Sequence, residues 1–150
     1  MSVLAKEYTD LDRALDEVRS TLEEWLDEQD EAAAPNAETV RYTQLVLHEW
    51  IANLLQHANF QNRTPTVEIR LASENRHVTC VVFDNSEGFN LVERLPSQEE
   101  TMDNLPERGM GLRIINACTD RLSYTSTESG RHRFEFSIPA DHDPWLSMLF

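Results

Sequence analysis

The sequence predicts an α+β two-layer sandwich, in which a mixed, mainly antiparallel sheet carries about three helices on one face. Two observations lead to this fold class. Apolar periodicity gives the order helix, helix, strand, strand, helix, strand, strand, and most of the strands are joined in pairs by short turns. The chain has 150 residues, 40% of them hydrophobic, which is enough for one domain with its own core.

Three segments have the periodicity of helices. The first, at about residues 9–29, repeats leucine and valine at helical spacing, and either Thr9 or Asp10 can cap it. The second, at about 37–58, has apolar residues around most of its circumference and should be buried on most sides. The third, at 109–119, opens with two glycines.

Four segments have the composition of strands. They lie at residues 66–72, 77–84, 121–128 and 131–139, and the last two form a hairpin around Ser129-Gly130. The second of them is the most apolar and should be the most central. The first eight residues supply either a short edge strand or no strand at all.

The composition also limits the partners. A net charge of −14 argues against a nucleic-acid surface and against anionic membranes, and it suits solubility or a basic protein partner. No apolar run reaches the length of a transmembrane helix, and the first residues include acids where a signal peptide is apolar. We therefore expect a cytoplasmic protein, in which Cys80 and Cys118 are small buried hydrophobes.

A row of polar residues interrupts the second helix. Glu49, Asn53 and His57 recur at intervals of four, so they share one helical face. On a generic helix such a row is a solvated stripe. Here apolar residues flank it on both sides, and unpaired polar groups in a core would cost roughly 1–3 kcal/mol each. The row therefore favours a cavity with a polar ligand, and a carboxylate and an amide one turn apart suit Mg²⁺ with its waters.

Two glycine-containing turns are further candidates. Asp84 ends the central strand and Gly88 follows four residues later, while Gly109 and Gly111 precede or open the third helix. Glycines let a backbone approach a ligand, and a helix N-terminus offers free N–H groups to phosphate. Taken singly, each turn is equally compatible with an ordinary tight loop.

Together the three features resemble the GHKL ATPase superfamily. The three similar motifs are the N box, the first glycine box and the second glycine box, at Glu49-xxx-Asn53-xxx-His57-Ala58, Asp84-x-x-x-Gly88 and Gly109-Met110-Gly111-Leu112. The resemblance covers about residues 37–139. The short length and the Asn-x-x-x-His-Ala ending are most similar to the anti-sigma-factor serine/threonine kinases.

The resemblance implies a Bergerat (histidine-kinase-like ATPase) fold that binds ATP and Mg²⁺ under a lid at about residues 89–108. Asn53 would coordinate the metal, and Glu49 would be the general base. Asp84 would accept a hydrogen bond from the adenine amino group, and Gly88 would let the base pack closely. The rest of the predicted nucleotide site is His57, Arg108, Gly109, Gly111 and Leu112, with Arg108 near the γ-phosphate and the glycines around the phosphates.

The sequence departs from the family pattern in two places. Ser86 stands where the first glycine box normally has its middle glycine. The predicted lid contains five acidic residues against two basic ones, which does not favour closure over a triphosphate. An apolar tail at 141–150 follows the last strand, and it either packs on its own domain or contacts a partner.

Two functions of different classes follow. The first is an ATP- and Mg²⁺-dependent serine/threonine kinase that regulates transcription by partner switching, with a sigma factor and a STAS-type anti-anti-sigma protein as partners. Relatives of this kind are commonly homodimers. The second is a catalytically weak or inactive GHKL domain that acts as a protein-binding adaptor. A third interpretation, a catalytic domain from a larger ATPase or sensor kinase, is disfavoured because the sequence lacks a transducer or histidine-bearing domain.

Overall fold

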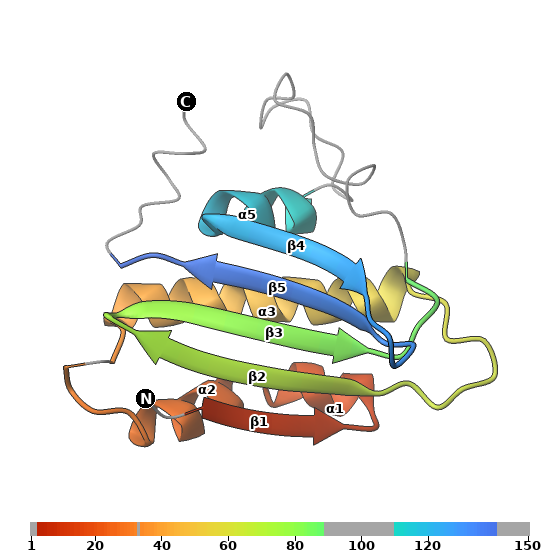
Figure 1. Cartoon of the computed structure of the whole chain (residues 1–150), viewed down its shortest axis with the longest axis horizontal. Helices are drawn as coiled ribbons and strands as arrows, with labels where there is room; N and C mark the ends of the chain where they lie inside the picture. Colours follow the sequence, from red (N-terminus) through yellow and green to blue (C-terminus); the bar gives the residue numbers. More distant parts are fainter. Residues whose placement is uncertain (1–2, 33, 89–109, 141–150) are drawn as a thin grey trace.

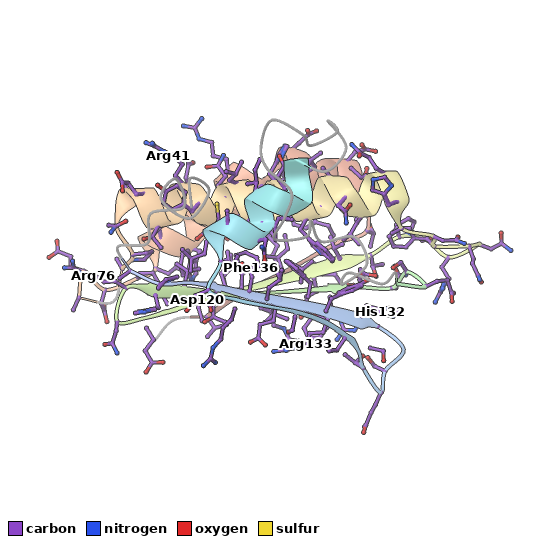
Figure 2. The ribbon with its side chains drawn as sticks, turned by 90° about the horizontal axis from the view of Figure 1, so that it is seen from above. Arg41, Arg76, Asp120, His132, Arg133 and Phe136 are labelled. Carbon is purple, nitrogen blue, oxygen red and sulfur yellow. The ribbon has the colours of Figure 1, made fainter. Side chains whose placement is uncertain are left out.

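A computed structural model of the chain describes residues 3–32, 34–88 and 110–140, with the backbone alone described at 110–113. The elements, in chain order, are β1 (Val3–Tyr8), α1 (Leu11–Asp16), α2 (Val18–Asp27), α3 (Ala37–His57), β2 (Val67–Glu74), β3 (His77–Asp84), α5 (Met110–Cys118), β4 (Arg121–Ser126) and β5 (His132–Ile138). The helices lie on one face of the sheet (Figures 1 and 2), so the predicted two-layer α+β class is confirmed.

The described strands form a sheet of the order β1-β2-β3-β5-β4, and the four pairings among them are antiparallel. The first residues do form an edge strand, β1, which pairs with β2. The most apolar strand, β3, is central as predicted. Its last residue, Asp84, pairs with Val67 at the start of β2 and with His132 at the start of β5. Residues that are far apart in the chain therefore meet at this end of the sheet.

The predicted helix at 9–29 is wrong in one respect, because the segment forms two helices that meet at Glu17. Glu17 has φ −99° and ψ 8°, which interrupts regular helical geometry. Neither glycine nor proline marks this break, so apolar spacing alone does not reveal it. Asp10 is the N-cap of α1, as expected, and its side chain accepts from the N–H groups of Asp12 and Arg13.

The core lies between the sheet and α3. Trp50 of α3 stacks on Phe134 of β5 with ring centroids 3.8 Å apart and an interplanar angle of 6°. Both side chains are fully buried. Cys80 and Cys118 are also buried, as predicted, and burial raises the pKa of the Cys118 thiol to about 11. No helix in the described ranges is long and apolar enough to cross a membrane.

The other face of the sheet is polar, and Arg133 lies on it while Phe136 lies on the helix side (Figure 2). The aromatic side chain of Phe83 also lies on this polar face. The guanidinium carbons of Arg70 and Arg131 lie 4.9 and 4.3 Å from the centroid of its ring. These cations cover an aromatic side chain that would otherwise face water.

We predict that Phe134→Ala lowers the free energy of unfolding by about 3–5 kcal/mol, because it removes the ring that stacks on Trp50 and leaves a cavity. Chemical denaturation measures this change. Leu45→Ala is the control, since Leu45 is 38% exposed on α3 and should change stability by only about 0.5 kcal/mol. Equal losses in the two variants would contradict the assignment of the core.

Candidate functional site

The polar row lies at the edge of the core on α3. Glu49 and Asn53 are half-buried, His57 is exposed at the last turn, and Trp50 and Leu54 beside them are fully buried. The amide nitrogen of Asn53 is buried and has no hydrogen-bond partner within the described part of the chain. An unpaired donor costs roughly 1–3 kcal/mol. The Asn53 amide therefore suits a ligand with acceptor oxygens, such as a phosphate group.

Asp84 has no exposed surface, and its own chain supplies its hydrogen bonds. Oδ1 accepts from the N–H of Ser86 at 3.0 Å and from the Ser86 hydroxyl at 2.5 Å. Oδ2 accepts from the hydroxyl of Tyr124 at 3.1 Å. Both oxygens are thus engaged, which compensates the burial of a carboxylate.

Tyr124 is a hydrogen-bond donor at this site over a wide pH range. Burial and the neighbouring Asp84 carboxylate raise the pKa of its hydroxyl well above the usual value, so the hydroxyl stays protonated. Its ring makes an edge contact with Trp50, with centroids 5.0 Å apart, and a tilted contact with His132 at 5.4 Å. Tyr124 therefore joins the core of α3 to the carboxylate of β3.

Ser86 closes the turn that follows β3. Its hydroxyl donates to Asp84 and accepts from the N–H of Gly88 at 3.0 Å. His132 Nδ1 lies 3.1 Å from the carbonyl oxygen of Ser86. Gly88 adopts φ +74°, and a Cβ built there would lie 2.4 Å from His132 Nε2. Gly88 is thus needed both for its backbone angle and for the close approach of the imidazole.

Hydrogen bonds tie this turn to the loop that follows α3. Asn85 accepts from the N–H of Thr66 and donates to the carbonyl of Thr64, both at 2.8 Å. The N–H of Glu87 donates to the carbonyl of Asn59 at 2.8 Å. Because Asn59 follows directly after α3, the C-terminal end of the polar row and the Asp84 turn are held at one end of the molecule.

The remaining predicted residues are only partly described. Gly111 and Leu112 lie in the first turn of α5, which packs beside α3, and their side chains are not described. Arg108, Gly109, the lid predicted at 89–108 and the tail at 141–150 lie outside the described residues. The roles assigned to all of these residues stay predictions.

One hollow of about 500 Å³ lies elsewhere on the sheet. Its lining consists of Thr79, Asp120, Arg121, Leu122, Ser123, Glu135 and Ser137. Thr79 and Ser137 pair near the start of β3, whereas Asp84 ends that strand, so the hollow is at the opposite end from the turn. It contains none of the predicted site residues. Within the described ranges, no cluster of three or more His, Cys, Asp or Glu residues forms a metal site.

The sequence interpretation missed Trp50, Tyr124 and His132. Their importance depends on strand register, because Tyr124 pairs with Phe134 across β4 and β5, and His132 pairs with Asp84. Alternation of apolar residues predicts the hairpin but not which residue of β4 reaches the carboxylate. The position of His132 opposite Asp84 follows only once β5 is known to lie beside β3.

Comparison with known proteins identifies the family of this chain. The profile of the histidine kinase-like ATPase domain family matches residues 8–132, which is most of the chain. The protein belongs to this family. The membership places it in the GHKL superfamily, as the sequence motifs predicted, and supports an ATP-binding function. A search of curated proteins gave no match.

A solved histidine kinase domain shares the fold of this chain. The histidine kinase domain of a blue-light-activated histidine kinase from Erythrobacter litoralis EL346 superposes with a TM-score of 0.51 and 17% identity, over 91% of this chain and 62% of that one. This chain thus spans less than two thirds of that structure. A nucleotide-free form of the catalytic domain of the histidine kinase ThkA gives a TM-score of 0.46 and 14% identity, over 91% of this chain and 97% of that one.

We predict that Gly88→Ala destabilises the protein more than Gly130→Ala does. Both glycines have positive φ, +74° and +84°, so each substitution carries the left-handed penalty of about 1–2 kcal/mol. Among the described residues, a Cβ added at Gly88 would meet the His132 ring, whereas one added at Gly130 would have nothing within 4 Å. Chemical denaturation of both variants isolates the steric contribution of the ring.

The control for this prediction is the same pair of substitutions in a His132→Ala background. There the cost of Gly88→Ala should fall to the cost of Gly130→Ala, because the imidazole is absent. A Gly88→Ala cost that the His132 change leaves unaltered would show that the ring does not lie against Gly88.

Proposed function

We propose that this protein is an ATP- and Mg²⁺-binding serine/threonine kinase of the anti-sigma-factor type, which regulates transcription by partner switching. The nucleotide proposal rests on the buried amide nitrogen of Asn53, which has no hydrogen-bond partner among the described residues and lies on a helix whose end is tied to the Asp84 turn. An acceptor-rich phosphate chain would satisfy this donor. The single oxygen of the same amide would be a hard ligand for Mg²⁺.

The proposed roles follow the chemistry of each residue. Asp84 is the acceptor that reads the amino group of the adenine base, and Gly88 leaves room for the base. Glu49, one turn before Asn53, is the general base that takes a proton from the hydroxyl of the acceptor protein. When bound, Mg²⁺ neutralises phosphate charge. His57, Arg108, Gly109, Gly111 and Leu112 complete the proposed nucleotide site.

The proposed partners are a sigma factor and a STAS-type anti-anti-sigma protein, and the proposed location is the cytoplasm. These partners rest on the likeness of the N box to that of anti-sigma-factor kinases. The net charge of −14 is compatible with a basic partner surface.

One observation favours a second candidate, a GHKL domain that works as a protein-binding adaptor without phosphate transfer. Asp84 is fully buried and both of its oxygens already accept hydrogen bonds from Ser86 and Tyr124. A carboxylate whose oxygens already accept hydrogen bonds has less capacity to accept one from an adenine base than a solvent-exposed carboxylate has. Nucleotide binding separates the two candidates.

We predict that calorimetric titration with Mg·ATP gives saturable binding, and that Asn53→Ala weakens it at least tenfold, about 1.4 kcal/mol, through loss of the amide. Gln56→Ala, an exposed residue on the same helix, is the matched control and should leave the affinity unchanged. Absence of binding at millimolar Mg·ATP would overturn the kinase proposal and favour the adaptor.

We further predict that Glu49→Gln leaves the Mg·ATP affinity within about threefold and abolishes phosphate transfer, since Gln keeps the shape but cannot accept a proton. The assay follows transfer from labelled ATP to a STAS-type protein. A collapse of affinity in Glu49→Gln would show that Glu49 is not a base. Transfer by the unmodified protein to histidine, with none to serine or threonine, would contradict the proposed acceptor class.

A further inference from the structure

Tyr124 donates to the oxygen of Asp84 that Ser86 does not bind. The carboxylate has no exposed surface, so a base can contact it only after a neighbouring group has moved. Oδ1 faces Ser86, which belongs to the same turn and also binds Gly88. Oδ2 faces Tyr124, which comes from another strand.

Tyr124 is the donor to Asp84 that comes from outside the turn. It is half-buried, unlike Asp84, and it belongs to β4, which among the described strands lies at the edge of the sheet and pairs with β5 alone. Its hydroxyl makes one hydrogen bond to Asp84, whereas Ser86 makes two and is held in the turn by Gly88. Release of Tyr124 therefore costs fewer contacts with the carboxylate than release of Ser86.

We propose that Tyr124 is a specificity-determining residue that competes with the base for Asp84 Oδ2. The proposal rests on the proposed nucleotide function. In the free protein the tyrosine hydroxyl occupies the donor position that the exocyclic amino group of a 6-aminopurine would take. Binding of such a base replaces the tyrosine hydroxyl with the amino group as the donor to Oδ2, so the amino group adds little net affinity. The protein therefore discriminates weakly between purines that have a 6-amino group and purines that lack one.

If the two donors compete, removal of the tyrosine hydroxyl should change the selectivity of the site for the base. Removing it leaves Oδ2 without that donor in the free protein, and a 6-amino group then supplies the missing hydrogen bond. Hydrogen bonds to charged groups are among the stronger ones in proteins, so the amino group should now increase affinity. A tyrosine with a purely structural role would instead change stability and leave base selectivity as it was.

The experiment compares Tyr124→Phe with the unmodified protein by calorimetric titration, using ATP and purine riboside triphosphate, which lacks the 6-amino group, both with Mg²⁺. The unmodified protein should bind the two within about threefold. Tyr124→Phe should bind ATP about tenfold more tightly than the analogue, a difference of about 1.4 kcal/mol. The double variant with Asp84→Asn and Tyr124→Phe should lose this preference for ATP over the analogue.

Tyr8→Phe is the matched control. Tyr8 is buried and its hydroxyl lies 2.8 Å from that of Thr21, between β1 and α2, so this variant also loses a buried tyrosine hydrogen bond. It should lower the melting temperature without altering the ATP-to-analogue ratio. Melting curves of both variants verify that each remains folded, which is expected because both keep the aromatic ring.

The outcomes distinguish this proposal from the nucleotide function. Equal ratios in the unmodified protein and in Tyr124→Phe, with both triphosphates binding, overturn the competition and leave ATP binding intact. A strong preference of the unmodified protein for ATP, lost in Tyr124→Phe, overturns it as well, because the hydroxyl would then assist the base. Failure of every variant to bind either triphosphate overturns the nucleotide function, and the competition with it.

Discussion

A carboxylate buried away from water must receive hydrogen bonds from its own chain or from a ligand, because an unpaired buried charge is very costly. Asp84 is such a carboxylate, at the end of the central strand, and the surrounding structure supplies the hydrogen-bond donors that it needs. The turn after β3 supplies Ser86, and β4 supplies Tyr124. This arrangement needs β5 between β3 and β4, and it needs Gly88, whose lack of a side chain admits His132.

The second constraint is the position of α3. Trp50 fixes the helix against β5 by stacking on Phe134, and it makes a T-shaped ring contact with Tyr124. Backbone and side-chain hydrogen bonds then hold the loop after α3 against the turn that contains Asp84. The buried donor of Asn53 and the buried acceptor of Asp84 are thereby parts of one framework that belongs to the histidine kinase-like ATPase family. They differ in one respect, since Tyr124 and Ser86 satisfy Asp84, whereas Asn53 Nδ2 has no partner among the described residues.

Periodicity alone was sufficient to predict the fold class, because α3 and the central strands have strong apolar patterns whose periods differ. It did not predict the interruption at Glu17, where no glycine or proline marks a change of direction. The motifs located Asn53 and Asp84, because the other residues of each motif lie close to them in sequence. Asn53 belongs to the polar row of α3, and Asp84 belongs to the turn that ends at Gly88. The motifs did not locate Tyr124 or His132, because both reach the site through strand pairing, and a shift of register by one residue would turn them to the other face.

The most direct test is a crystal structure of the protein with Mg²⁺ and a non-hydrolysable ATP analogue. We expect the 6-amino group to lie within about 3.2 Å of Asp84 Oδ2, the Tyr124 hydroxyl to have moved out of hydrogen-bond distance, and Asn53 to contact the phosphates or the metal. An analogue bound elsewhere, with the Tyr124–Asp84 hydrogen bond intact and Asn53 without a contact to it, would contradict the proposed site.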